Sequence, residues 1–380
     1  MDFTLTAPEK HFQEKARRFA VNELRPAAQK LDAEISFSIS HVKKAAELGF
    51  LGVYIPTKFG GAGATAVCYA LMITELAREC AGTTVGIAVT NLTCEAINLW
   101  GNETQKAKYL PRLTSGEAIA GAFCLSESSS GSDASHMSTT AKRDGDYYIL
   151  NGEKMWITNG AHAGIMVVMA VTDKSKGSKG VSAFIVERGY KGVSVGKAEE
   201  KMGIRASITT SIALDEVRVP IENLLGNEGD GFKVAMSSLD AGRIGVAAQA
   251  IGIGFSAIEL ARDYAKKRTQ FGKTLSDFQA IQWMLADALT EMEAARLLCL
   301  RSAWMKDRGM SFTKEASMAK VYSTEAVNRV VRNMTQIFGG YGYLNDNPIA
   351  QKFRDARVTT IYEGTSEIQR LVIARGLLRD

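Results

Sequence analysis

The spacing of apolar residues divides the chain into a helical part, a strand-rich part and a second helical part. Up to about residue 117, apolar residues recur at helical spacing and predict a helix at the N-terminus and others near 40–48, 66–80, 84–100 and 104–113. Thr6 and Glu9 form a capping-box pattern with Pro8 in the first turn, which indicates where the first helix begins. Residues 1–117 are therefore predicted to form a helical domain.

The pattern changes near Gly121 and becomes typical of β-strands. Residues 139–160 hold two turn signals, Asp144-Gly145 and Asn151-Gly152, flanked by alternating or aromatic residues, which predicts a β-meander. Residues 165–171, 181–186 and 209–220 add further strands. We expect a small β domain over residues 118–225.

Helical spacing returns from about residue 228. A long helix dense in Gly and Ala is predicted over 231–268, and two more long helices over 276–307 and 313–338. Small residues let helices approach closely, so the first of these should lie at the centre of a bundle spanning residues 226–380. The order of the parts predicts an α+β protein of three domains, which a length of 380 residues also favours.

Composition excludes several classes of function. Lys plus Arg is 46 and Asp plus Glu is 41, and the difference of +5 is too small and too dispersed to indicate nucleic-acid binding, although it is compatible with a ligand that carries phosphates. The five cysteines and four histidines show no metal-ligand spacing, so we expect reduced thiols, a cytoplasmic protein and no metal site. No secretory signal is evident at the start, and no apolar run is expected to cross a bilayer.

One motif match is misleading. The stretch GIGFSA (252–257) fits the dinucleotide fingerprint, but that motif needs a preceding strand, and here it lies inside the predicted long helix. Close helix packing is the favoured interpretation. The chain also lacks a Walker loop, a nucleophile elbow and an HExxH motif, so hydrolysis by serine or zinc is unsupported.

Two stretches of the β part suit a flat, polar-edged ligand. FCLSESSSGSD (123–133) leads from a strand into a loop of hydroxyls, which could hold a ring edge or a pyrophosphate or could be a solvated loop. KMWITNG (154–160) places Trp156 and Thr158 on one face of a strand, where an indole could pack on a heterocycle and a hydroxyl could bond its edge. The alternative is a core Trp beside a surface Thr.

Three stretches of the C-terminal part carry candidate chemistry. KKRTQFGK (266–273) ends the long helix with Arg268, either as a phosphate contact or as compensation of the helix dipole. QIFGGYGY (336–343) is a glycine-rich helix end where a ligand could approach the backbone closely, or a plain C-cap. In IYEGTSEIQR (361–370), the lone carboxylate of Glu363 precedes a glycine, and Ser366 and Gln369 predict a capping box for the last helix. The alternative for Glu363 is simple stabilisation of a helix N-terminus.

These stretches occur together, and from end to end the chain resembles the acyl-CoA dehydrogenases, with IYEGTSEIQR similar to the active-site stretch of the short- and medium-chain branch. LDAGRIGVAAQAIGI (239–253) is most similar to the short-chain, butyryl-CoA dehydrogenase-like branch. The resemblance implies a β-barrel-like middle domain, a C-terminal four-helix bundle, FAD as cofactor, and a homotetramer built as a dimer of dimers.

The resemblance also implies a role for individual residues. Glu363 would be the catalytic base, and substrate would meet Ser132, Asp240, Arg243 and Gly364. Ser126 would bond the pyrimidine edge of the flavin, and Thr158 would lie near N5. The implied FAD contacts are Phe123, Leu125, Ser126, Ser132, Trp156, Ile157, Thr158, Thr365 and Glu367, together with Arg268, Phe271, Gln279, Gln336, Gly339 and Gly340, which would mainly reach the FAD of a neighbouring subunit.

The implied activity is oxidation of a short acyl-CoA to trans-2-enoyl-CoA within fatty acid β-oxidation. Glu363 would remove the α-proton, hydride would pass to flavin N5, and the electrons would go to electron-transfer flavoprotein. Two alternatives remain open: an enoyl-CoA reductase running the same chemistry backwards, and a non-catalytic acyl-CoA- or flavin-binding protein, against which Glu363 argues. Isovaleryl-type relatives carry their base one position before Arg243, where this chain has Gly242.

Overall fold

The N-terminal part of the chain is helical, as the apolar pattern predicts. In the computed structural model, which describes residues 4–378, α1 (Ala7–Phe19) begins at the predicted capping box, with the Thr6 N–H donating to Glu9 Oε2 at 2.7 Å. A π-helical turn (Ala20–Leu24) connects it to α2 (Arg25–Glu34). The helices α3 (Ile39–Glu47), α4 (Ala66–Glu79), α5 (Ala81–Trp100) and α6 (Glu103–Thr114) follow, which confirms the four later predictions.

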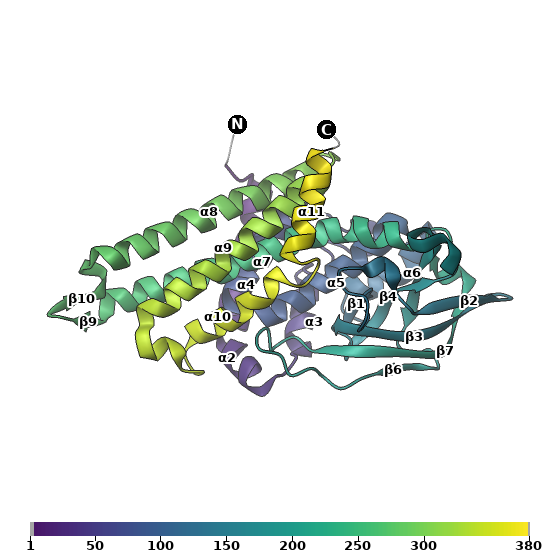
Figure 1. Cartoon of the computed structure of the whole chain (residues 1–380), viewed down its shortest axis with the longest axis horizontal. Helices are drawn as coiled ribbons and strands as arrows, with labels where there is room; N and C mark the ends of the chain where they lie inside the picture. Colours follow the sequence, from purple (N-terminus) through teal and green to yellow (C-terminus); the bar gives the residue numbers. More distant parts are fainter. Residues whose placement is uncertain (1–3, 379–380) are drawn as a thin grey trace.

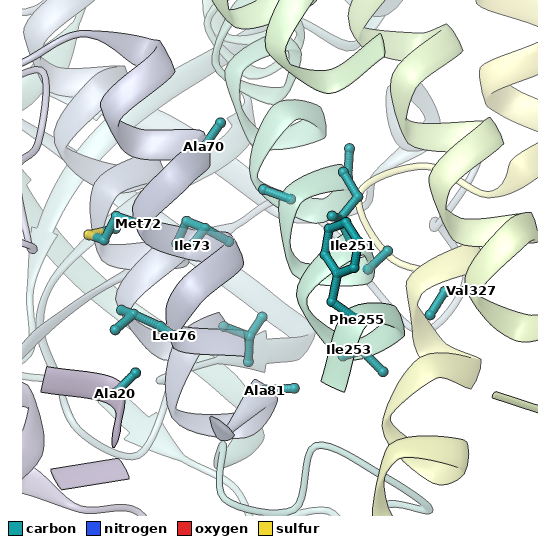
Figure 2. Close-up of a cluster of buried hydrophobic side chains, with 14 of the residues drawn as sticks. Ala20, Ala70, Met72, Ile73, Leu76, Ala81, Ile251, Ile253, Phe255 and Val327 are labelled. Atoms are coloured by element: carbon teal, nitrogen blue, oxygen red, sulfur yellow. The ribbon is translucent and has the colours of Figure 1, made fainter. Parts of the chain in front are cut away.

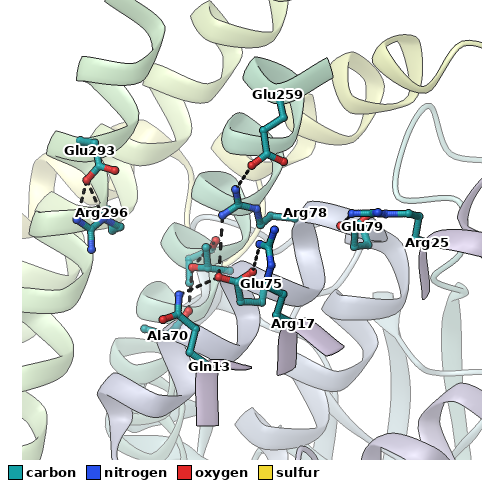
Figure 3. Close-up of polar contacts among 12 residues, drawn as sticks. Gln13, Arg17, Arg25, Ala70, Glu75, Arg78, Glu79, Glu259, Glu293 and Arg296 are labelled. Carbon is teal, nitrogen blue, oxygen red and sulfur yellow. Dashed lines mark hydrogen bonds and ion pairs between the residues drawn. The ribbon is translucent and has the colours of Figure 1, made fainter. Parts of the chain in front are cut away.

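Charged side chains connect these helices to the C-terminal part. Figure 3 shows Glu75 of α4 accepting hydrogen bonds from Gln13 Nε2 at 2.8 Å and from Arg17 Nη1 at 3.1 Å, both on α1. On the same side, Arg78 of α4 forms an ion pair with Glu259 of the long helix α7 (Gly231–Lys267). Two of the three parts of the chain are therefore joined through α4.

The middle part is a sheet of eight strands with most neighbours antiparallel. The strands are β1 (Ala120–Cys124), β2 (Thr140–Asp144), β3 (Tyr147–Thr158), β4 (Ala163–Val171), β5 (Val181–Glu187), β6 (Val193–Val195), β7 (Thr209–Pro220) and β8 (Leu224–Leu225). Their order is β6-β7-β3-β2-β4-β5-β8, and β1 runs parallel to β4. In β4, Ile165 and Val167 face one apolar cluster while Met166 and Val168 face another. Burial on both faces explains the unbroken apolar run of this strand.

One of the two predicted turns is wrong. Asp144-Gly145 does mark the turn between β2 and β3, since Asp144 ends β2 and Gly145 begins the two-residue connection, but Asn151 and Gly152 lie inside β3 at a bulge where the register with β7 shifts. Gly152 has a φ of +147°, and a Cβ there would lie 2.5 Å from Thr139 Oγ1. The Asn151 side chain bonds Glu216 on β7, with its Nδ2 2.6 Å from Glu216 Oε1. Close approach of Thr139, rather than a chain reversal, accounts for the glycine.

The C-terminal part is a bundle around α7. After α7 come the hairpin of β9 (Thr269–Gln270) and β10 (Lys273–Thr274), then α8 (Gln279–Asp307), α9 (Thr313–Phe338), α10 (Pro348–Arg357) and α11 (Ser366–Leu377). Figure 1 shows the hairpin at the end of the molecule away from the middle sheet. The predicted fold class, two helical parts with a sheet between them, is confirmed.

The glycines of GIGFSA serve helix packing, as predicted. A Cβ at Gly252 would overlap the carbonyl oxygen of Thr74 on α4, and one at Gly254 would overlap Met292 of α8. Figure 2 shows Ile251 and Phe255 of α7 between α4 and α9. Among the described residues, α7 is the one helix long and apolar enough to cross a bilayer, contrary to expectation, but 89% of its most apolar window is buried inside the protein. Its apolar character is therefore that of a core helix.

Candidate active site

Glu363 lies on a strained turn between a short 3₁₀ helix (Val358–Thr360) and α11. Its φ is +51°, in the left-handed region, and Gly364 follows with a φ of +92°. The predicted capping box of Ser366 and Gln369 is wrong, because Thr365 is the N-cap and its Oγ1 accepts from Ile368 N–H at 3.4 Å. The side chain of Gln369 instead holds the turn. Its Nε2 donates to the carbonyl oxygens of Glu363 at 3.2 Å and Gly364 at 3.0 Å.

The carboxylate of Glu363 is buried between helices. Its Oε2 has no hydrogen-bond partner in the described part of the chain, and burial raises the pKa of Glu363 to about 7, although the charges of Lys320 and Arg243 oppose this shift. A Cβ on Gly242 of α7 would overlap this oxygen and would lie 3.5 Å from Leu92 Cδ1 of α5. Positions 242 and 363 therefore face the same space, and the glycine leaves room for the carboxylate.

Asp240 and Arg243 lie on α7 on either side of Gly242, which faces this space. Arg243 Nη1 is 2.5 Å from Asp240 Oδ1, and Asp240 Oδ2 accepts from Thr313 Oγ1 at 2.5 Å. Both side chains are largely buried, and burial raises the pKa of Asp240 and lowers that of Arg243. The structure thus brings Asp240, Arg243, Glu363 and Gly364 into one cluster.

A second group of predicted residues gathers at the end of β3. Trp156 is 58% exposed and has a φ of +63°, at a bulge where the register of β3 against β7 shifts between Lys154 and Ile157. The Met155 N–H donates to the carbonyl oxygen of Ser126 at 2.9 Å, so the Ser-rich segment runs beside this strand end. Burial varies within the group: Leu125 and Ile157 are buried, Phe123, Ser126 and Thr158 are half-buried, and Ser132 is exposed.

A buried ion pair that the sequence reasoning missed fixes these two segments together. Lys154 Nζ is 2.8 Å from Glu127 Oε1, and the two side chains are 0% and 2% exposed. Burial raises the pKa of Glu127, but hydrogen bonds from Lys154, Ser138 and Thr139 outweigh it and lower that pKa to about 2. The signal was available in the sequence, because Lys154 directly precedes Met155-Trp156 and Glu127 directly follows Ser126.

Helix α5 connects the two clusters. Asn159, just after β3, donates from Nδ2 to the carbonyl oxygen of Gly86 at 2.9 Å, and Leu92 on the same helix faces position 242. Six residues of helix separate Gly86 from Leu92, a rise of about 9 Å. The strand end and the carboxylate are thus both positioned against the same helix.

A third group lies apart from both clusters, at the hairpin end of the molecule (Figure 1). A groove of about 480 Å³ is lined there by Arg268, Gln336, Gly339, Gly340 and Tyr341, among others. The Arg268 guanidinium lies 5.8 Å from the centre of the Tyr341 ring. Nearby Phe271 is 92% exposed, and Gln279 is exposed at the start of α8. Of the remaining predicted contacts, Thr365 caps α11 and Glu367 is exposed in its first turn.

The chain belongs to the acyl-CoA dehydrogenase family. The family models for the N-terminal, middle and C-terminal domains of acyl-CoA dehydrogenase match residues 6–117, 122–217 and 229–378. Among the described residues, no group of His, Cys, Asp and Glu side chains could hold a metal ion.

Its relatives include enzymes of two kinds. The chain is 44% identical to a short-chain specific acyl-CoA dehydrogenase of Clostridium acetobutylicum over the whole of both chains. It is 45% identical to an acryloyl-CoA reductase (NADH) of Anaerotignum propionicum, over 100% of this chain and 96% of that one. Among solved structures, it matches a chain in that of the electron transferring flavoprotein of Acidaminococcus fermentans, with a TM-score of 0.98, 44% identity and full coverage of both chains.

Proposed function

We propose that this protein catalyses the FAD-dependent dehydrogenation of a short-chain acyl-CoA to trans-2-enoyl-CoA, with Glu363 as the base that removes the α-proton. One observation carries the proposal: a buried carboxylate oxygen without a partner among residues 4–378 faces the space that Gly242 leaves open. Its pKa of about 7 suits proton transfer near neutral pH, because a base is most effective when its pKa lies near the working pH.

The residues at the end of β3 fit FAD. The exposed indole of Trp156 offers a flat apolar wall, and the half-buried hydroxyls of Ser126 and Thr158 offer hydrogen bonds to a polar ring edge. The Lys154–Glu127 pair keeps these groups in fixed positions. When bound, FAD supplies the acceptor for the hydride that leaves the β-carbon.

The other residues of the cluster orient the thioester and exclude water. Among the described residues, the backbone N–H of Glu363 has no acceptor, so it can donate to the thioester oxygen as negative charge develops there. Asp240 and Arg243 would contact the CoA side of the substrate, together with Ser132 and Gly364. Burial of Glu363 disfavours its charged form, and the neighbouring charges of Lys320 and Arg243 restore part of the ionised population that can accept a proton.

We also propose that the protein assembles as a homotetramer, a dimer of dimers, in the cytoplasm. The groove at Arg268 lies at the opposite end of the chain from the middle sheet, so a cofactor bound at Trp156 would reach such a groove only on a neighbouring subunit. Thr365 and Glu367 are proposed as further FAD contacts. Electron-transfer flavoprotein is the proposed acceptor in fatty acid β-oxidation, a proposal supported by the similarity to a chain in the Acidaminococcus structure.

A second candidate is the reverse reaction, reduction of a short enoyl-CoA. The similarity to the acryloyl-CoA reductase of Anaerotignum propionicum favours it, at the same level of identity. The same residues would act: protonated Glu363 would return its proton to the α-carbon, and the β-carbon would receive a hydride from reduced FAD, when bound.

Steady-state turnover of the FAD-loaded protein tests the proposal and separates the directions. With butyryl-CoA and a dye acceptor we expect crotonyl-CoA as product, and Glu363→Gln should form it far more slowly while still retaining flavin. Absence of crotonyl-CoA from the parent protein, despite bound FAD, would contradict the proposal. Rapid NADH oxidation with acryloyl-CoA or crotonyl-CoA, and slow oxidation of butyryl-CoA, would favour the reductase.

A further inference from the structure

Lys320 is a buried lysine that contacts the turn of Glu363. It lies on α9 with no exposed surface, and its Nζ donates to the carbonyl oxygen of Gly364 at 2.7 Å. Within the described chain it forms no ion pair, unlike Arg243, which is paired with Asp240. Burying an ammonium group is costly unless charges or hydrogen bonds compensate it. Among the carboxylates that can compensate Lys320, Glu363 favours the protonated lysine most strongly, ahead of Glu325 and Glu367.

The turn itself requires external support. A left-handed φ in a residue other than glycine is unfavourable by roughly 1–3 kcal/mol, and it persists only where surrounding contacts hold it. At Glu363 these contacts are the bonds from Lys320 and Gln369 to the two carbonyl oxygens of the turn. Both donors lie on the side of the carbonyl oxygens, so they fix the backbone and leave the Glu363 carboxylate free to face Gly242.

Few other groups around Glu363 can set its charge. Arg243 approaches from α7, Tyr69 from α4, Tyr54 from the segment before α4 and Tyr362 from the same turn, while α5 contributes the apolar Leu92. Burial raises the pKa of all three tyrosines well above 10, so they stay neutral in the working range. Lys320 is therefore the cation near Glu363 that no other carboxylate neutralises by direct pairing.

We propose that Lys320 is a positioning residue for the base: its ammonium group fixes the Glu363–Gly364 turn, and its positive charge favours the ionised form of Glu363 that accepts the proton. The proposal rests on the proposed function of Glu363. In agreement with it, the charge of Lys320 is the largest of the influences that lower the pKa of Glu363, and burial lowers the pKa of Lys320 itself to about 8.

Titration of Glu363 in the FAD-loaded, substrate-free protein tests this directly. The carboxyl band of Glu363 is identified in infrared difference spectra as the band that Glu363→Gln lacks. Its midpoint should lie near pH 7 in the parent and rise by about one pH unit in Lys320→Met, because a neighbouring positive charge is removed. Lys320→Arg keeps the charge, so its Glu363 midpoint should stay within a few tenths of a pH unit of the parent value. The acid limb of kcat/KM for butyryl-CoA should move in parallel.

Lys352→Met is the matched control. Lys352 is also buried and donates to two backbone carbonyl oxygens, of Arg78 at 2.7 Å and Glu79 at 3.2 Å, but the charges that act on it do not include Glu363. Its loss should lower thermal stability and leave the Glu363 midpoint unchanged. If Lys320→Met does not fold, Lys320→Gln, which lacks the charge but keeps a donor, decides the same question.

An unchanged midpoint in the uncharged variant, or an equal rise in Lys320→Arg, would overturn the proposal. Failure of the proposed function has a different signature. The parent would then not dehydrogenate butyryl-CoA, whereas the infrared titration would still report whether Lys320 and Glu363 are coupled.

Discussion

Replacing Glu363 by Gln should stabilise the protein at alkaline pH while it removes the activity. The pKa of Glu363 is raised from 4.5 to about 7 by burial, so the folded state binds a proton more tightly than the unfolded chain does. The pKa difference of 7 − 4.5 = 2.5 units corresponds to a loss of about 3 kcal/mol from the free energy of unfolding once Glu363 is ionised in the folded protein. The loss is absent below about pH 4.5 and grows as the pH rises to about 7, because the native state binds more protons than the unfolded chain in this window. Because the amide of Glu363→Gln does not ionise, the variant should not lose this stability as the pH rises.

The assay is thermal unfolding of the FAD-loaded proteins at pH 5 and pH 8. An unfolding entropy of about 2.1 cal/mol/K per residue over this chain converts 3 kcal/mol into a rise in Tm of about 4 °C at pH 8, with little change at pH 5. Glu103→Gln is a control of opposite sign. Glu103 is exposed on α6, and its hydrogen bond with Lys58 lowers its pKa, so its replacement should not stabilise the protein at pH 8. A Glu363→Gln variant whose Tm change is the same at both pH values would refute the reasoning.

Three further predictions concern the preferred acyl chain length, the assembly of subunits and the chain position of the catalytic base. Specificity (kcat/KM) should be higher for butyryl-CoA than for palmitoyl-CoA, and the reverse order would argue against a short-chain substrate. Arg268→Ala should lower FAD content and loosen the assembly together, since the proposed groove contact joins two subunits; unchanged flavin content and unchanged size by light scattering would count against it. Glu363→Gly combined with Gly242→Glu should recover part of the dehydrogenase activity that Glu363→Gly alone loses, because positions 242 and 363 face the same space. The recovery should be incomplete, since displacing a base by about 1 Å can lower the rate roughly a hundredfold.

Much of the fold follows from local patterns. The range predicted for α9, 313–338, matches Thr313–Phe338, and the helix over 231–268 matches α7 to within one residue, because long amphipathic or small-residue periodicities are strong signals. The predicted turn at Asn151-Gly152 is wrong because the glycine there accommodates a contact with Thr139, on the other side of the connection between β2 and β3. A glycine required by a long-range approach looks the same in sequence as one required by a turn.

The candidate site is only partly accessible to sequence reasoning. The glycine turn indicates Glu363, but nothing in the local pattern indicates Lys320 or the role of Gln369, which together hold that turn. Lys320 lies in a helical pattern where lysine normally marks the solvent face, and its burial results from α9 packing against the turn before α11. The predicted cap is one residue too late, since Thr365 and Ser366 are both acceptable N-cap residues and only the backbone distinguishes them.

Anaerobic stopped-flow reduction of the bound flavin by butyryl-CoA tests the central claim, that Glu363 removes the α-proton, most directly. The parent protein should lose its yellow flavin absorbance rapidly in a single turnover. Glu363→Gln should keep its flavin and bind butyryl-CoA, but its flavin should be reduced slower by about 100- to 10,000-fold, because an amide cannot accept the proton. Flavin reduction in Glu363→Gln at close to the parent rate would contradict the account and remove Glu363 from the mechanism.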